Sequence, residues 1–294
     1  MTAQLITGLA AGAAYALVAV GVVLIFKGTR VLSIAQGEIG AFGFFVGLRW
    51  QARGIPGLRW HPPLFATLVV AVVIGAVIGL VVERFVMRPM VGRPPLDPLI
   101  ATLGIALFLA LAEELLFGTA TQFAPSPVGN WKIVVLGATL TAPRIVALVM
   151  AAAVASAIYV FFARTKFGLA VLATTGDPTV ARLLGVPVNQ VYRFAWVVGG
   201  ALSGLAAGLL APAFGGLTPF AQTSFALRAL AGAVIGGLDS VWGAIIGSLA
   251  IGVLEGVVGG QIATPGASET AVLILIVATL LVRPRGLLGA EGAA

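Results

Sequence analysis

The chain has 294 residues, of which 60% are hydrophobic and only 9% are charged. Soluble domains carry roughly 25% charged residues, so this composition excludes a soluble protein and predicts one that crosses a membrane several times. The chain has no cysteine and a single histidine, which excludes disulfides, thiolate metal sites and the usual multi-histidine zinc sites. The net charge of +7 fits cations at cytoplasmic helix ends better than a nucleic-acid partner, because no basic run is interleaved with aromatic residues.

The first apolar run, 5–26, predicts a retained membrane helix with its N-terminus outside. No Lys or Arg precedes it, whereas a signal peptide needs a basic segment before its apolar core. The first cations, Lys27 and Arg30, follow the run and predict its cytoplasmic end.

The remaining apolar runs predict an all-α, polytopic transmembrane bundle with about eight crossings, since one crossing needs about 20 apolar residues. The piece 225–238 is too short to cross easily and predicts a broken or re-entrant helix. Asp239 and Ser240 make a polar turn after it. Either 225–238 dips in while the next segment climbs back, or both cross as short tilted helices. The expected spans are 5–26, 33–50, 64–82, 98–117, 143–163, 191–211, 241–260 and 269–282.

This orientation assigns the loops between spans to two sides. The loops at 27–30, 83–97 and 164–190 fall inside, where they hold most of the 17 basic residues. The loops at 51–62 and 118–142 fall outside. The longer outer loop contains a strand-like Val-rich run and is either a contact for an extracytoplasmic partner or a plain connector.

Ionisable residues within membrane segments are costly and are candidates for function. Glu38 lies in a glycine-rich, broken-looking stretch and either lines the transport path or caps a broken helix. Glu113 and Glu114 are expected to reach the outer interface, whereas Arg228 and Glu255 are expected to pair with each other. The candidates for the translocation path are Tyr15, Ser33, Gln36, Gly37, Glu38 and Glu255.

Thirty-nine glycines, many repeated every four residues, predict closely packed helices. Two of these series, near the C-terminus, are expected either to pack helices within the chain or to lie at a subunit interface. All five series with this spacing are Gly8/Gly12, Gly43/Gly47, Gly200/Gly204/Gly208, Gly243/Gly247 and Gly252/Gly256/Gly260, and the last two are the C-terminal ones.

The sequence TTGDPTVARLLGVPV, residues 174–188, predicts a short capped helix outside the membrane. Asp177 suits the N-cap, Pro178 the first helical position and Gly185 the left-handed position after the last turn. A helix this short does not persist alone, so it must dock on something. Its apolar face is formed by Val180, Leu183 and Leu184.

The chain lacks the GxxxxGK[ST] loop that cradles nucleotide phosphates, because none of its three lysines follows a glycine or precedes Ser or Thr. It also has no plausible catalytic set and no metal site. We therefore expect a transport protein without a cofactor of its own rather than an enzyme.

Three blocks of the sequence resemble the branched-chain amino acid ABC permeases of the LivH type. They are AYALVAVGVVLIFKGTRVLSIAQGEIGAFG (14–43), the run at 168–208 that includes the capped helix, and RPRGLLG (283–289). The resemblance implies a single permease domain over 1–294 with a cytoplasmic coupling loop at about 164–190. The ATPase-coupling residues that it implies are Asp177, Pro178, Val180, Ala181, Leu183, Leu184 and Gly185.

The resemblance also implies partners: a LivM-like permease, two ABC ATPases that hold the ATP and Mg²⁺, and an extracytoplasmic solute-binding protein, in a bacterial or archaeal inner membrane. One departure concerns the solute. Where the family usually has Asn-Phe-Ala-His-Gly, this chain has Ser-Ile-Ala-Gln-Gly at 33–37. Urea, short amides or organic acids are therefore alternatives to amino acids, and a stand-alone channel or ion-coupled carrier is the alternative class.

Overall fold

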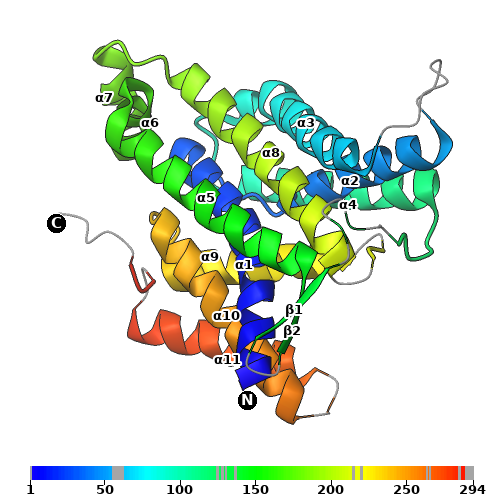
Figure 1. Cartoon of the computed structure of the whole chain (residues 1–294). Coiled ribbons are helices and arrows are strands. Elements are labelled where there is room, and N and C mark those ends of the chain that lie inside the picture. Colours follow the sequence, from blue (N-terminus) through cyan, green and yellow to red (C-terminus); the bar gives the residue numbers. More distant parts are fainter. Residues whose placement is uncertain are drawn as a thin grey trace.

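The computed structural model is a helical bundle with one small β-hairpin (Figure 1). It describes residues 2–54, 63–123, 126, 129, 131–135, 138–213, 216–218, 221–262, 264, 266–283 and 286–288, so His61 and its loop lie outside the described residues. The elements are α1 (Thr2–Thr29), α2 (Gln36–Arg53), α3 (Leu64–Val82), η1 (Glu83–Met87), η2 (Arg88–Met90), α4 (Leu96–Phe117), β1 (Lys132–Val135), β2 (Ala138–Thr141), α5 (Ala142–Arg164), α6 (Lys166–Gly176), α7 (Pro178–Leu183), α8 (Val188–Ala213), α9 (Ala221–Gly236), α10 (Val241–Gln261) and α11 (Ala267–Val282).

Six helices in the described part of the chain are long and apolar enough to cross a membrane. They are α1, α3 with its continuation to Met90, α4, α5, α8 and α10. The expected multi-pass membrane protein is thus confirmed, although the count of eight is not. The expected spans that fall short are α2, with 18 residues and several polar side chains, and α11, with 16 residues.

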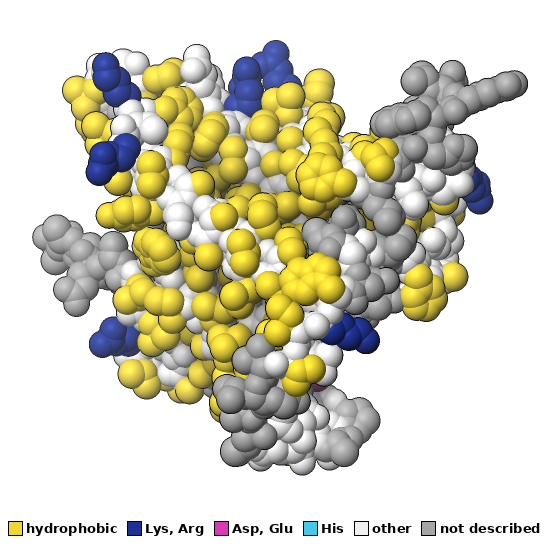
Figure 2. Space-filling model, in the orientation of Figure 1, with side chains coloured by type: hydrophobic (Ala, Val, Ile, Leu, Met, Phe, Trp, Pro, Cys, Tyr) yellow, Lys and Arg dark blue, Asp and Glu magenta, His cyan; other side chains and the backbone are white. Residues whose placement is uncertain are grey.

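The centre of the bundle is formed by α1 and α8, whose side chains are mostly buried. The helices α3, α4, α5 and α11 surround them and expose large apolar side chains, including Phe65, Phe108, Leu115 and Leu281. Figure 2 shows apolar side chains over most of one face, with Lys and Arg toward its margins. This distribution is typical of a protein whose outer surface contacts lipid.

Glycines bring the helix backbones into direct contact. Gly8 and Gly12 of α1 face Gly252 of α10, and Gly232 and Gly236 of α9 face the glycines of α10's first turns. The suggestion that the C-terminal glycine series lie at a subunit interface is therefore wrong. They pack α10 against α1 and α9 within the chain, because only a missing Cβ lets these backbones approach so closely.

The bundle has two distinct ends, which lie at opposite ends of α5 (Figure 1). The β-hairpin precedes α5 and lies beside the start of α1, and we call this the hairpin end. α6 and α7 follow α5, and we call their side the α7 end. Arg30, after α1, pairs with Asp239, between α9 and α10, at 3.1 Å. The polar turn at Asp239 therefore lies at the α7 end.

Two segments differ from what the sequence led us to expect. The predicted loop 83–97 is helical as far as Met90, through a π-helical turn and a 3-10 turn. The predicted loop 164–190 contains a second helix, α6, which begins where the Thr165 hydroxyl accepts a hydrogen bond from Gly168 N at 2.9 Å. The break that the sequence suggested around Glu38 lies before this residue, since α1 ends at Thr29 and α2 runs without interruption from Gln36 to Arg53.

Candidate functional site

The short helix α7 is held at both ends as its sequence predicted. Asp177 Oδ1 accepts hydrogen bonds from the backbone N–H groups of Thr179 at 2.7 Å and Val180 at 3.1 Å. Gly185 takes the left-handed conformation, with φ of +82°, and Val186 N then donates to the carbonyl of Ala181 at 2.9 Å. This closing pattern satisfies the last helical carbonyls without adding another turn.

The structure answers which face of α7 is free. Ala181 is buried, and it packs with Val186, Val188 and Tyr192 at the start of α8. The apolar side chains point the other way: Val180 is 50% exposed, Leu183 83% and Leu184 76%. Three exposed aliphatic side chains on one capped turn form an apolar patch outside the membrane segments, which is a feature typical of protein interaction sites.

Side-chain contacts connect this end of the bundle to its central helix. The Thr175 hydroxyl, at the end of α6, donates to the Lys27 carbonyl oxygen at 2.6 Å. Arg30 donates in return to the Thr175 carbonyl oxygen at 2.9 Å and also binds Asp239. These contacts join the end of α6 to the end of α1, and Arg30 joins both to the turn between α9 and α10.

The candidate path residues do not form one site. Ser33 and Gln36 are buried and line a small cavity between α1 and α9, of about 10 Å³. The Gln36 side chain lies between Gly21 of α1 and Gly199 of α8, and its Nε2 has no hydrogen-bond partner within the described residues. A cavity of this size accommodates about one water molecule, so these residues form a narrow polar point in the bundle.

Glu38 points to a different neighbour. It is 1% exposed and interacts with Glu113 of α4, which is fully buried. The expectation that Glu113 reaches the outer interface is therefore wrong, because this side chain turns inward against α2. Glu38 is also absent from the lining of the Gln36 cavity. Two neighbouring buried carboxyl groups would repel each other if both were charged, so this contact between α2 and α4 is unfavourable with two carboxylates.

Tyr15 and Glu255 belong to a third group. The Tyr15 hydroxyl donates to Glu255 Oε2 at 2.8 Å, and Arg228 pairs with Glu255 Oε1, as expected from the sequence. Arg228 also binds Glu269 at 2.9 Å. These contacts join α1, α9, α10 and α11, and the two residues of the central ion pair are mostly buried.

We expect Arg228→Ala to lower the free energy of unfolding by about 3 kcal/mol, because it leaves the Glu255 carboxylate buried without a cation. Glu269→Gln is the matched control, with an expected effect below about 1 kcal/mol, because this partner is 62% exposed. Thermal unfolding in detergent measures both. Equal melting temperatures for the two variants would contradict the role given to the buried pair.

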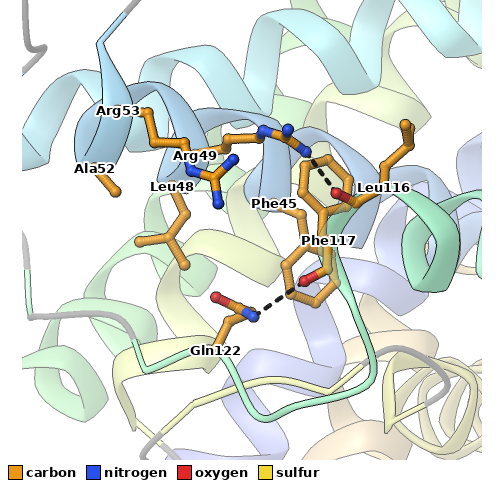
Figure 3. Close-up of a pocket in the computed structure, with 8 residues that line it drawn as sticks. All are labelled: Phe45, Leu48, Arg49, Ala52, Arg53, Leu116, Phe117 and Gln122. Atoms are coloured by element: carbon orange, nitrogen blue, oxygen red, sulfur yellow. Dashed lines mark hydrogen bonds between the residues drawn. The ribbon is translucent and has the colours of Figure 1, made fainter.

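A cavity of about 260 Å³ opens where α2 and α4 end, at the hairpin side of the molecule (Figure 3). Phe45 stacks on Phe117, with ring centroids 5.5 Å apart, and Arg49 donates to the Leu116 carbonyl oxygen. Gln122, from the loop after α4, donates to the Phe117 carbonyl oxygen at 3.3 Å. Sequence reasoning missed this pocket because its parts lie far apart in the chain.

Comparison with known proteins places these features in a family. The profile of the family described as branched-chain amino acid transport system / permease component matches residues 4–282. The chain is 29% identical over 292 residues to the high-affinity branched-chain amino acid transport system permease protein BraD of Pseudomonas aeruginosa, covering 97% of this chain and 95% of that one. It is 28% identical to the corresponding LivH of Escherichia coli K12, covering 97% and 94%. It is also 28% identical to the probable LivH of Methanocaldococcus jannaschii, covering 94% and 88%.

Proposed function

The chain belongs to the family of branched-chain amino acid transport permease components, and from this we propose that it is the membrane subunit of an ABC importer for branched-chain or related amino acids. The observation that carries the proposal is the family match over 4–282, together with relatives that share nearly the whole chain. The chain carries the solute pathway, while ATP and Mg²⁺ bind to separate ATPase subunits. A second, LivM-like permease and an extracytoplasmic binding protein complete the assembly.

The α7 end faces the cytoplasm in this proposal, and α7 is the contact with the ATPase. The exposure of Leu183 and Leu184 supports this, since apolar side chains outside the membrane need a partner surface. Asp177, Pro178 and Gly185 shape the helix, and Ala181 seats it on α8. The side chains that enter the ATPase are therefore Val180, Leu183 and Leu184.

We propose eight spans, formed by the six long helices together with α2 and α11, plus α9 as a short broken helix that brings the chain from the outside to the turn at Asp239, from which α10 returns. The pairing of Asp239 with Arg30 supports this arrangement, because it joins the turn between α9 and α10 to the α7 end, which faces the cytoplasm in this proposal. Closure of the ATPases on ATP would move α6 and α7. The hydrogen bonds of Thr175 and Arg30 would pass this movement to α1 and α9, which border the cavity at Gln36.

The test is uptake by proteoliposomes that contain this chain, its partner permease, the ATPases and the binding protein. We expect uptake of radiolabelled leucine that requires ATP inside the vesicle, next to the ATPase, and the binding protein on the opposite side. Urea and acetamide in the same assay distinguish the alternative solutes. Uptake by the permease alone, driven by an ion gradient and indifferent to ATP, would instead support a carrier.

A further inference from the structure

A cavity at the α7 end lies behind α7, on the side away from its exposed leucines. Its volume is about 370 Å³, which is within the range of small-ligand sites. The end of α1, the η1–η2 connection, the start of α4, α7 and α8 form its walls. Arg30, Arg88, Arg93 and Arg182 line it, and Glu83 is the one acidic residue among the lining residues.

The four arginines of the lining are not neutralised by acidic residues of the same lining. Glu83 is 1% exposed, and both of its oxygens receive hydrogen bonds from Arg88, at 3.1 and 3.5 Å. Arg93 lies 3.9 Å from Asp97 in an exposed pair, which is a weak interaction. Arg30 pairs with Asp239, which lies outside the lining, at 3.1 Å. No acidic side chain forms an ion pair with Arg182 within the described residues. The lining therefore carries a surplus of positive charge.

A buried hydrogen-bond donor also lines the cavity. Trp196 is fully buried, and its indole Nε1–H has no acceptor in the part of the chain that the structure describes. An unpaired buried donor is costly, and a ligand that brings an oxygen acceptor would satisfy it. The cavity thus offers guanidinium groups and an N–H donor, while its single carboxylate is already occupied by Arg88.

We propose that this cavity binds a phosphate group, supplied either by an anionic lipid headgroup or by a soluble phosphate. A phosphate has oxygens for several guanidinium groups at once, and arginine matches its geometry with paired hydrogen bonds. A zwitterionic amino acid fits less well, because the one carboxylate of the lining, Glu83, is 1% exposed and already neutralised by Arg88, so it offers little to an ammonium group. A cation is excluded by the four arginines.

A bound phosphate would connect α7 to the rest of the bundle. Arg182 belongs to α7, whereas Arg88 and Arg93 belong to the connection between α3 and α4. The ligand would bridge these segments and hold α7 in its seat. Val91, which is 46% exposed, lines the same cavity and offers an apolar contact for the glycerol or acyl part of a lipid.

The experiment measures thermal unfolding of the full chain in neutral detergent after delipidation. The ligands are phosphatidylglycerol, phosphatidylcholine as the zwitterionic control, and inorganic phosphate against chloride at equal ionic strength. We expect a concentration-dependent rise in melting temperature with phosphatidylglycerol that phosphatidylcholine does not reproduce. A similar rise with inorganic phosphate identifies a soluble source as sufficient, and its absence identifies the lipid headgroup. The result is independent of ATPase docking, since no ATPase is present.

Variants locate the site. Arg93→Gln/Arg182→Gln should weaken the apparent affinity by at least about tenfold, because two charge-assisted contacts are lost. Arg164→Gln/Arg193→Gln is the matched control, since it removes the same charge from residues that do not line the cavity. Trp196→Phe keeps an aromatic side chain, although a smaller one, removes the N–H donor and should weaken affinity by several-fold. Equal affinities in the cavity and control variants, or no rise with either phosphate source, would overturn the proposal.

Discussion

Replacing Leu183 or Leu184 by Asp is expected to abolish ATP-driven uptake while the permease stays folded. Both side chains are more than three-quarters exposed, so the substitution removes little packing within the chain. Surface changes of this kind usually alter stability by less than about 0.5 kcal/mol. An apolar groove of an ATPase would instead have to bury a carboxylate, which costs several kcal/mol and weakens docking by roughly a hundredfold or more.

The measurement compares uptake, ATPase activity stimulated by the binding protein, and co-purification of the ATPase with the permease. Ala181→Asp is the contrasting variant from the same helix. Ala181 is 2% exposed against the start of α8, so its substitution should lower the melting temperature of the permease itself. Normal uptake in Leu183→Asp and Leu184→Asp proteoliposomes would show that α7 does not meet the ATPase through this face.

The sequence was sufficient to predict α7 because its signals are local. Asp177, Pro178 and Gly185 act on backbone groups within one or two turns, and each has the predicted role or conformation. The same reasoning could not decide the direction of the apolar face. That direction depends on Val188 and Tyr192 of α8, which receive Ala181 in a way that helix periodicity alone does not reveal.

The path candidates show a different limit. Glu38 and Glu255 are candidates because an ionisable residue within a membrane segment is costly. Their grouping depends on helix pairing. Glu38 meets Glu113 of α4, Gln36 lies between α1 and α8, and Tyr15 meets Glu255 of α10. No spacing along the chain indicates these neighbours, because they lie on different helices whose packing the sequence pattern does not specify.

The predicted crossings are not confirmed where length and polarity disagree. α2 reads as membrane from its glycines and aromatic residues, yet its first turn carries Gln36 and Glu38 and its helix has only 18 residues. The interruption lies before Gln36 rather than around Glu38, because the glycines of α2 are accommodated within one continuous helix. The π-helical turn at Glu83 carried no signal that a pattern of apolar residues would reveal.

The glycine contacts lead to the second large expected effect. In most helix positions Gly→Ala stabilises by about 0.5–1 kcal/mol, because alanine loses less backbone entropy on folding. At Gly252 the sign should reverse. A Cβ there would overlap the backbone atoms Gly12 N and Gly8 O of α1, and backbone of a central helix cannot turn aside as a flexible side chain can. We expect Gly252→Ala to cost about 2–3 kcal/mol, the upper part of the range for overpacked sites.

Gly104→Ala is the matched control, because a Cβ at Gly104 of α4 meets no atom within 4 Å. The two variants differ only in what the added methyl group touches, so thermal unfolding in detergent should move in opposite directions. Gly252→Leu extends the test, since a larger side chain must separate α1 from α10 and should prevent recovery of folded protein. If Gly252→Ala were as stable as Gly104→Ala, α1 and α10 would not cross at these glycines. The hydrogen bond from the Tyr15 hydroxyl to Glu255 depends on the same crossing of α1 and α10. That result would therefore also contradict the position of the Arg228–Glu255 ion pair beside Tyr15.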